Sequence, residues 1–175
     1  EASTRSWLRP GSRARDLLVV DLGSGDGSMV RAATREAGFG TSVGLEINPF
    51  LACYSALLAG LNEVIHWRSL WTVALHDADV VLVYGWTPIM GELGAKLQAE
   101  LKEGAVVVSN EYALPAKWLG EPTDMHYVET GSSSWKYVET GSIFQRLAWY
   151  LGSLDTSSHL LRYEQTAPRA RKARV

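Results

Sequence analysis

The chain has 175 residues with 46% hydrophobic residues and a formal net charge of −2, which is enough for one globular domain with its own core. Its only cysteine, Cys53, excludes an internal disulfide and favours a reducing, matrix-like compartment, and no apolar run reaches the roughly 18 residues that span a bilayer. Basic residues are concentrated near the two ends and leave an acidic middle, which argues against a nucleic-acid surface.

This charge pattern predicts a basic N-terminal arm at residues 1–15, a folded domain at 16–163 and a basic C-terminal tail at 164–175. The arms are either disordered or laid on a partner. The Arg- and Ser-containing start is also typical of the remnant of an organelle-targeting segment. Cys53 lies in an apolar helical stretch and is predicted to be a small core residue.

The most informative stretch of the sequence is V-V-D-L-G-S-G-D-G at 19–27, which predicts a strand, a glycine turn and the start of a helix. The apolar run at 17–20 predicts a buried strand, and residues 28–37 predict a helix with Ser28 as a possible N-cap. Between them, Gly23, Gly25 and Gly27 remove the side chains from a tight turn. Exposed backbone N–H groups beside a helix N-terminus are typical of a nucleotide-type site.

Carboxylates around this turn restrict the class of ligand that can bind there. Asp21 and Asp26 would repel a pyrophosphate, and the spacing lacks the third glycine of the dinucleotide-binding pattern. Glu46 ends the next predicted strand, at 43–46, where a carboxylate accepts hydrogen bonds from a ribose diol. These features favour S-adenosylmethionine, a ligand with a sulfonium, an amino-acid end and a ribose but no phosphate. The alternative is an ordinary strand–helix turn in another α/β protein.

The following segments continue the alternation of helices and strands. Pro49 begins a predicted helix that ends at Gly60, Ser69-Leu70-Trp71 follows a strand at the expected place of an adenine edge, and Leu93, Leu97 and Leu101 form the apolar stripe of a later helix. The remaining predicted elements are strands at 64–68, 79–84 and 105–108 and a helix at 89–102.

The alternation predicts an α/β fold: a Rossmann-like doubly wound, mostly parallel sheet. Ligands bind beyond the carboxyl ends of the strands in such sheets. The residues expected to converge there are Asp21, Gly23, Glu46, Ser69, Tyr84 and Asn110.

The last third departs from this alternation. Residues 125–130 and 135–140 are near copies joined by G-S-S-S, which predicts a C-terminal β-hairpin or two edge strands. Residues 142–151 fit a strand or a helix, and 160–163 fit a last strand.

With these motifs placed, the chain resembles class I S-adenosylmethionine-dependent methyltransferases. More narrowly, it resembles the small mitochondrial protein-lysine methyltransferases that modify the c-ring protein of ATP synthase and the adenine nucleotide translocase, with their bacterial relatives. The resemblance covers about residues 17–118 and rests on D-L-G-S-G-D-G at 21–27, G-L-E-I-N-P-F-L-A-C-Y-S at 44–55, S-L-W at 69–71 and V-V-S-N-E-Y-A-L-P at 107–115.

The resemblance implies a set of cofactor-binding residues. The methionine part of the cofactor would lie against Asp21, Gly23, Gly25 and Asp26; the ribose would lie against Glu46 with Asn48 beside it; and the adenine would lie near Ser69 and Leu70. Two features depart from the family. It usually carries an acidic residue at the position of Ser69, and its aromatic-Val-Pro-Thr segment is not found in residues 1–16.

For the acceptor, Tyr84, Trp86 and Tyr112 could line an aromatic pocket or pack as core. Asn110 could orient an amine or cap its strand. Methyl transfer to a neutral amine requires positioning and desolvation rather than a dedicated base. The four histidines have no metal-ligand spacing, so no metal is expected.

Two functions therefore remain open, both with a protein substrate or neighbouring subunits as partners and without nucleic acid. The first is a mitochondrial protein-lysine N-methyltransferase. The second is a weak or inactive methyltransferase-fold subunit of a large mitochondrial complex, anchored by its basic arms. A small-molecule or RNA methyltransferase is a third interpretation, against which the acidic middle argues.

Overall fold

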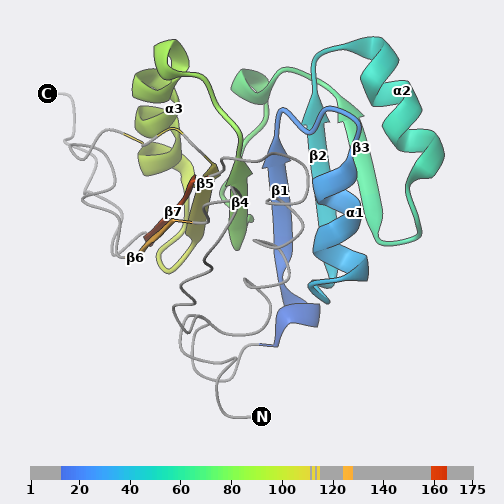
Figure 1. Ribbon diagram of the computed structural model, residues 1–175, viewed down its shortest axis with the longest axis horizontal. Coiled ribbons are helices and arrows are strands. Elements are labelled where there is room, and N and C mark those ends of the chain that lie inside the picture. The colour runs from blue at the N-terminus through green and yellow to red at the C-terminus, as the bar shows by residue number, and fades with distance from the viewer. Residues whose placement is uncertain (1–12, 111, 113, 115–123, 128–158, 165–175) are drawn as a thin grey trace, which may run out of the picture.

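The computed structural model describes residues 13–110, 112, 114, 124–127 and 159–164, and these form a twisted sheet with helices packed along it (Figure 1). The elements in chain order are a 3₁₀ turn η2 (Ala14–Asp16), β1 (Leu18–Leu22), α1 (Ser28–Arg35), β2 (Thr41–Glu46), α2 (Pro49–Leu58), β3 (Glu63–Trp67), a 3₁₀ turn η3 (Leu70–Thr72), β4 (Val80–Val83), α3 (Thr87–Glu100), β5 (Val106–Asn110), β6 (Asp124–Tyr127) and β7 (His159–Glu164).

The order of strands across the sheet is β3-β2-β1-β4-β5-β7-β6. The first five strands pair in parallel, whereas β7 runs antiparallel to both β5 and β6. The chain leaves β3 at one edge and returns to β4 beside β1, so the strand order reverses between β1 and β4. Such a switch point opens a crevice at the carboxyl ends of the strands. The prediction of a doubly wound, mostly parallel sheet is confirmed.

The central strands β1, β4 and β5 are buried on both faces because their side chains alternate between two apolar clusters, whereas most residues of the edge strand β3 are exposed or partly exposed. Val19 and Val80 face the cluster that includes Ala33 of α1, whereas Val20 and Val81 face the cluster that includes Leu93 of α3. The predicted stripe of α3 is confirmed, since Leu93, Leu97 and Leu101 are all buried. Fully buried strands of this kind read as continuous apolar runs, which is why their positions were predictable.

The C-terminal part agrees only in part with the sequence prediction. Residues 124–127 form β6 and residues 159–164 form β7, as expected for strands at 125–130 and 160–163. However, the partner of β6 is β7, and residues 135–140, the expected second arm of a hairpin, lie outside the described residues, as do 142–151. The division into a basic arm, a domain and a basic tail stays a prediction.

Two local predictions were wrong. Ser28 is the first helical residue of α1 rather than its N-cap; that position belongs to Gly27, whose φ of 75° only glycine adopts freely. Cys53 is exposed rather than buried, because α2 turns Ala52 and Ser55 towards the sheet and leaves Cys53 on its outer side.

Candidate functional site

The predicted site residues gather at the carboxyl edge of the sheet. Asp21 lies near the end of β1, Glu46 ends β2, Tyr84 follows β4 and Asn110 ends β5. These four strands are neighbours and run in parallel (Figure 1), so their ends meet at the switch point beside β1.

The glycine turn between β1 and α1 is held against the end of β2. The backbone N–H groups of Gly23 and Ser24 both donate to the Leu45 carbonyl oxygen, at 2.9 and 3.0 Å. Gly23 and Gly25 have φ of 85° and 54°, and a Cβ added at either would meet no atom within 4 Å. A Cβ at Gly27 would instead strike the Ser55 hydroxyl of α2. The turn is therefore open at its first two glycines and closed at the third.

Glu46 points at this turn and fixes its shape. It is 7% exposed, and its Oε2 accepts from the Gly25 N–H at 2.7 Å while its Oε1 accepts from the Asn48 N–H at 2.7 Å. Each carboxylate oxygen has a second lone pair. The side chain can thus organise the turn and still accept hydrogen bonds from a bound molecule.

Asp21 is the second buried carboxylate of the site, at 6% exposure. Burial, and then the nearby charges of Glu46 and Asp26, raise the pKa of Asp21 to about 7. No hydrogen bond from a described residue opposes this shift. A buried carboxylate that lacks donors of its own is a ready partner for a cationic group, because a nearby positive charge favours its ionised form.

Asp26 and Asn48 accept hydrogen bonds from backbone N–H groups at the start of the helices that follow them, α1 and α2. Asp26 is exposed, and its Oδ1 accepts from the Ser28 N–H at 2.9 Å. Partial burial works to raise the pKa of Asp26, but the bonds from Ser28 and the charge of Arg31 outweigh it and hold that pKa below its usual value. The Asn48 Oδ1 accepts from the N–H groups of Phe50 and Leu51 and so caps α2.

Ser69 and Leu70 lie just beyond β3, as expected. Leu70 begins η3, and the Ser69 Oγ is its N-cap, accepting from the Trp71 N–H at 3.4 Å. Leu70 packs against the core on the α3 face. Ser69 keeps its hydroxyl proton and a further lone pair for another partner.

The residues predicted to bind the methyl-accepting substrate differ in their exposure. Tyr84 and Trp86 are exposed, at 57% and 67%, on the loop between β4 and α3. Tyr112 is partly buried against the core cluster, and its carbonyl oxygen accepts from the Ser109 Oγ at 2.6 Å. Asn110 follows the Val83–Ser109 pair in β5, and its side chain lies outside what the structure describes. Tyr84 and Trp86 are therefore not core residues, whereas Tyr112 packs against the core; the aromatic pocket stays a prediction.

Sequence reasoning missed two residues beside the turn, Ser24 and Ser55. Both are buried, and neither hydroxyl has a hydrogen-bond partner within the part of the chain that the structure describes. Ser24 lies against the Cα of Gly44 and Ser55 against that of Gly27. No pattern singles out a serine inside an apolar helix, so only the close approach of α2 to the turn reveals Ser55.

Among the described residues, no group of three or more His, Cys, Asp and Glu side chains is arranged to hold a metal ion. No helix within the same residues is long and apolar enough to cross a membrane.

The fold is that of the α/β methyltransferases. An RNA methyltransferase from Salinibacter ruber, solved in complex with S-adenosyl-L-homocysteine, superposes with a TM-score of 0.66 at 20% identity, covering 92% of this chain and 88% of that one. At this identity the likeness shows the shared fold alone.

The family is narrower than the fold. Residues 21–119 match the ANTKMT methyltransferase domain, and the chain belongs to that family. It is 41% identical over 122 residues to the adenine nucleotide translocase lysine N-methyltransferase of Mus musculus, covering 64% of this chain and 52% of that protein. It is 36% identical over 130 residues to the lysine N-methyltransferase of the ATP synthase c-ring protein from Xenopus laevis, covering 71% and 55%. The chain therefore spans about half the length of these two relatives.

A third relative is matched over most of its length. The protein-lysine N-methyltransferase of Saccharolobus islandicus (strain REY15A) is 30% identical over 137 residues, covering 75% of this chain and 83% of that protein. The resemblance inferred from the sequence motifs is confirmed.

Proposed function

We propose that this chain binds S-adenosylmethionine at the carboxyl ends of β1 and β2 and transfers its methyl group to a lysine of a protein substrate. The observation that carries the proposal is the pair of buried carboxylates, Asp21 and Glu46, beside a turn that is open at Gly23 and Gly25. A ligand there must approach bare backbone and carry positive charge and hydroxyl donors, and it must lack phosphate.

The residues present fit this cofactor. Asp21, which has no donor among the described residues, would hold the cationic amino-acid end. Glu46, with both oxygens already aligned by the N–H groups of Gly25 and Asn48, would accept from the ribose hydroxyls. Ser69 and Leu70 would border the adenine. Of the remaining candidates, Asp26 and Asn48 would act through the shape of the turn and of α2.

The chemistry that the cofactor supplies when bound is an electrophilic methyl group on a sulfonium. This chain's contribution is to position the acceptor and exclude water. Tyr84 and Trp86 are exposed and follow β4, whose last residue pairs with the last residue of β1. Their rings would guide the apolar stem of a lysine and rest against its ammonium before it loses its proton. Asn110, at the adjacent strand end, would orient the neutral amine, and Tyr112 would support that loop from the core.

The relatives support a protein lysine as the class of substrate. Three are named as lysine methyltransferases, two of them for the ATP synthase c-ring protein and for the adenine nucleotide translocase. We therefore propose that this chain acts on a lysine of a protein substrate, and that it does so in mitochondria.

The alternative is a methyltransferase-fold subunit with little activity. One observation favours it: Ser69 stands where the family usually has an acid, and its Oγ already accepts from the Trp71 N–H. A weaker hold on the adenine lowers cofactor affinity without changing the fold.

Calorimetry with S-adenosylmethionine, followed by transfer of a labelled methyl group to lysine-containing proteins, tests the proposal. Glu46→Gln is expected to weaken cofactor binding by roughly tenfold to a hundredfold, the cost of losing charge-assisted acceptors. The matched control is Glu63→Gln, which changes a buried carboxylate at the other end of the sheet and should leave the affinity unchanged. Absence of any heat with the unmodified chain contradicts the proposal, and binding without transfer selects the alternative.

A further inference from the structure

Helix α2 is packed with its small residues inward and its large residues outward. Its buried residues are Ala52 and Ser55, whereas Phe50 is 84% exposed and Leu57 is 79% exposed. An amphipathic surface helix normally shows the opposite arrangement, with the large apolar side chains in the core. The outer side of α2 therefore exposes large apolar side chains to solvent, which is unfavourable unless a partner covers them.

The exposed apolar surface extends beyond the helix to both of its flanks. Leu61, in the turn after α2, is fully exposed, and Trp67 at the end of β3 is 66% exposed. The Trp67 Nε1 donates to the Ile47 carbonyl oxygen at 2.9 Å, which ties the strand end to the start of α2. We call this surface the α2 face, and its residues are Ile47, Phe50, Tyr54, Leu57, Leu61 and Trp67.

The α2 face is larger than the apolar patches of ordinary soluble proteins. From the exposed fractions of its six side chains, it presents on the order of 800 Å² of mostly apolar surface, against roughly 300–600 Å² for the largest patch of a typical monomer. It lies on the outer margin of the molecule, where α2 is the last helix beside the edge strand β3 (Figure 1).

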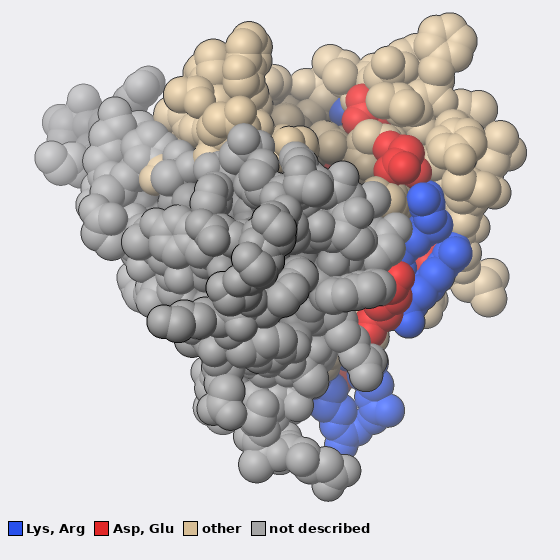
Figure 2. Space-filling model, viewed as in Figure 1, with Lys and Arg blue, Asp and Glu red and all other residues tan. Residues whose placement is uncertain are grey.

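The stretch of chain that carries this face, residues 47–75, exposes Lys, Arg, Asp or Glu charge of one sign. Between residues 47 and 75 the only Lys, Arg, Asp or Glu side chains are Glu63 and Arg68; Glu63 is buried and paired with Arg35, and Arg68 is exposed. Figure 2 shows the region over α2 without charge, while blue and red side chains gather beside it. The stretch 47–75 thus exposes an arginine and no carboxylate, and the exposed Asp26 of the glycine turn lies outside it. An apolar surface with this charge complements an anionic, apolar partner.

We propose that the α2 face docks this chain onto the surface of a lipid bilayer that contains anionic headgroups. Phe50, Leu57 and Leu61 enter the boundary between headgroups and acyl chains, Tyr54 and Trp67 lie at headgroup level, and Arg68 pairs with lipid phosphate.

A protein partner fits the α2 face less well. A protein interface of this size carries about one hydrogen bond per 100–200 Å². Among the six side chains, only the Tyr54 hydroxyl and the Trp67 N–H are polar, and the Trp67 N–H already donates to Ile47. Acyl chains form no hydrogen bonds, so an apolar side chain can be buried among them without a polar partner.

Docking of this kind has a consequence for the proposed cofactor site. Ile47 directly follows Glu46, so the α2 face begins one residue from the carboxylate assigned to the ribose. The bilayer would then lie beside the carboxyl edge of the sheet, and an acceptor lysine would be reached close to the membrane surface.

Flotation of the full chain with vesicles tests the inference independently of cofactor binding. The chain should float with phosphatidylcholine vesicles that contain phosphatidylglycerol. The double change Leu57→Glu with Leu61→Glu should lower the partition coefficient by roughly tenfold or more. The control, Ala74→Glu with Ala99→Glu, adds the same charge at two exposed positions outside the α2 face and should keep most of the binding. Arg68→Gln should cost about fivefold on the anionic vesicles and little on pure phosphatidylcholine.

Thermal unfolding of each variant shows that it is folded, since Leu57 and Leu61 make no core contacts that the change could break. Three outcomes overturn the proposal. They are no flotation of the unmodified chain, equal flotation of the Leu57 and Leu61 variant and its control, and a dimer in solution that this variant alone converts to monomer, which would assign the face to a second copy.

Discussion

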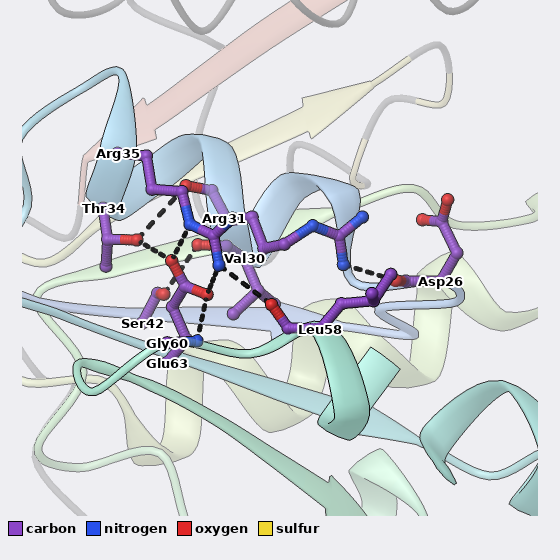
Figure 3. Close-up of polar contacts among 9 residues, drawn as sticks. All are labelled: Asp26, Val30, Arg31, Thr34, Arg35, Ser42, Leu58, Gly60 and Glu63. Carbon is purple, nitrogen blue, oxygen red and sulfur yellow. Dashed lines mark hydrogen bonds and ion pairs between the residues drawn. The ribbon is translucent and has the colours of Figure 1, made fainter. Parts of the chain in front are cut away.

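Two buried carboxylate sites lie at opposite ends of the same sheet and are built in opposite ways. Glu63 begins β3 and is satisfied from four directions: the Arg35 Nε and Nη2 donate at 2.8 and 2.7 Å, the Thr34 hydroxyl at 2.6 Å and the Gly60 N–H at 2.7 Å (Figure 3). Asp21, near the end of β1, has no such donors among the described residues.

The pKa values follow this difference. Burial works to raise the pKa of Glu63, but the bonds from Arg35, Thr34 and Gly60 outweigh it, so the pKa lies below its usual value. Burial of Asp21 is not offset and raises its pKa to about 7. A satisfied carboxylate ties elements together, whereas an unsatisfied one costs stability until a ligand arrives. We therefore interpret the Glu63 end as structural, and the contrast supports the proposal that the Asp21 end binds a ligand.

The largest expected effect comes from removing the charge of Asp21. The unfolded pKa is about 3.9 and the folded value is about 7, so the folded state retains the proton more strongly. Stability from this group is full below pH 4, is lost as the pH rises to 7 and is constant above that. Between pH 5 and pH 8 the unmodified chain should lose about 3 kcal/mol that Asp21→Asn does not lose, measured by urea unfolding at both pH values.

The same variant should lose cofactor binding. Greater stability joined to loss of binding is the behaviour of a residue kept for function. Equal pH dependence of Asp21→Asn and the unmodified chain would mean that Asp21 is solvated or paired in solution, and the comparison with Glu63 would fail.

At the other carboxylate the expected effect has the opposite sign. Arg35→Ala leaves Glu63 buried with Thr34 and Gly60 as its remaining donors among the described residues and should destabilise the chain to urea more than its control does, with cofactor affinity unchanged. Arg31→Ala is the matched control on the same helix, because the one hydrogen bond of Arg31 to a described residue runs from its Nη1 to the Asp26 carbonyl oxygen, at 2.8 Å. This change should cost about 1 kcal/mol or less. Similar losses for the two variants would show that the Glu63 cluster contributes little.

A smaller effect is expected on the pH dependence of binding. A cationic ligand selects the ionised form of Asp21, so binding should release a proton below pH 7, and the affinity for S-adenosylmethionine should rise up to about tenfold per pH unit between pH 5 and 7. Calorimetry in two buffers with different ionisation enthalpies measures the released proton. The pH dependence should be flat in Asp21→Asn, and a slope that persists there assigns the proton to another group.

The sequence was most informative where one local cause decides the structure. Apolar runs such as 80–83 predicted buried strands, and the spacing of Gly23 and Gly25 with Glu46 predicted the turn and its place in the fold, because bare backbone and acidic strand ends have few other uses together.

The sequence failed where tertiary packing decides. Cys53 lies in an apolar run that is equally consistent with a buried helix, and only the close approach of Ser55 to Gly27 fixes which side of α2 faces inward. The lack of donors around Asp21 and their excess around Glu63 were also invisible, since Arg35 and Thr34 reach Glu63 across 28 and 29 positions of sequence.

The smallest expected effect concerns the adenine end, where Ser69 stands in place of the acid that the family usually carries. Its Oγ lies 3.4 Å from the Trp71 N–H, a weak cap that an aspartate also provides. Ser69→Asp restores a charged acceptor for an exocyclic amine without disturbing η3, so it should tighten cofactor binding by about 1 kcal/mol, roughly fivefold. Calorimetry with S-adenosylhomocysteine measures this, and Ser69→Asn, a neutral cap of the same size, should gain less. Unchanged or weaker binding in Ser69→Asp would mean that the adenine does not reach η3, and Asp21 and Glu46 would then have to supply the specificity of the site alone.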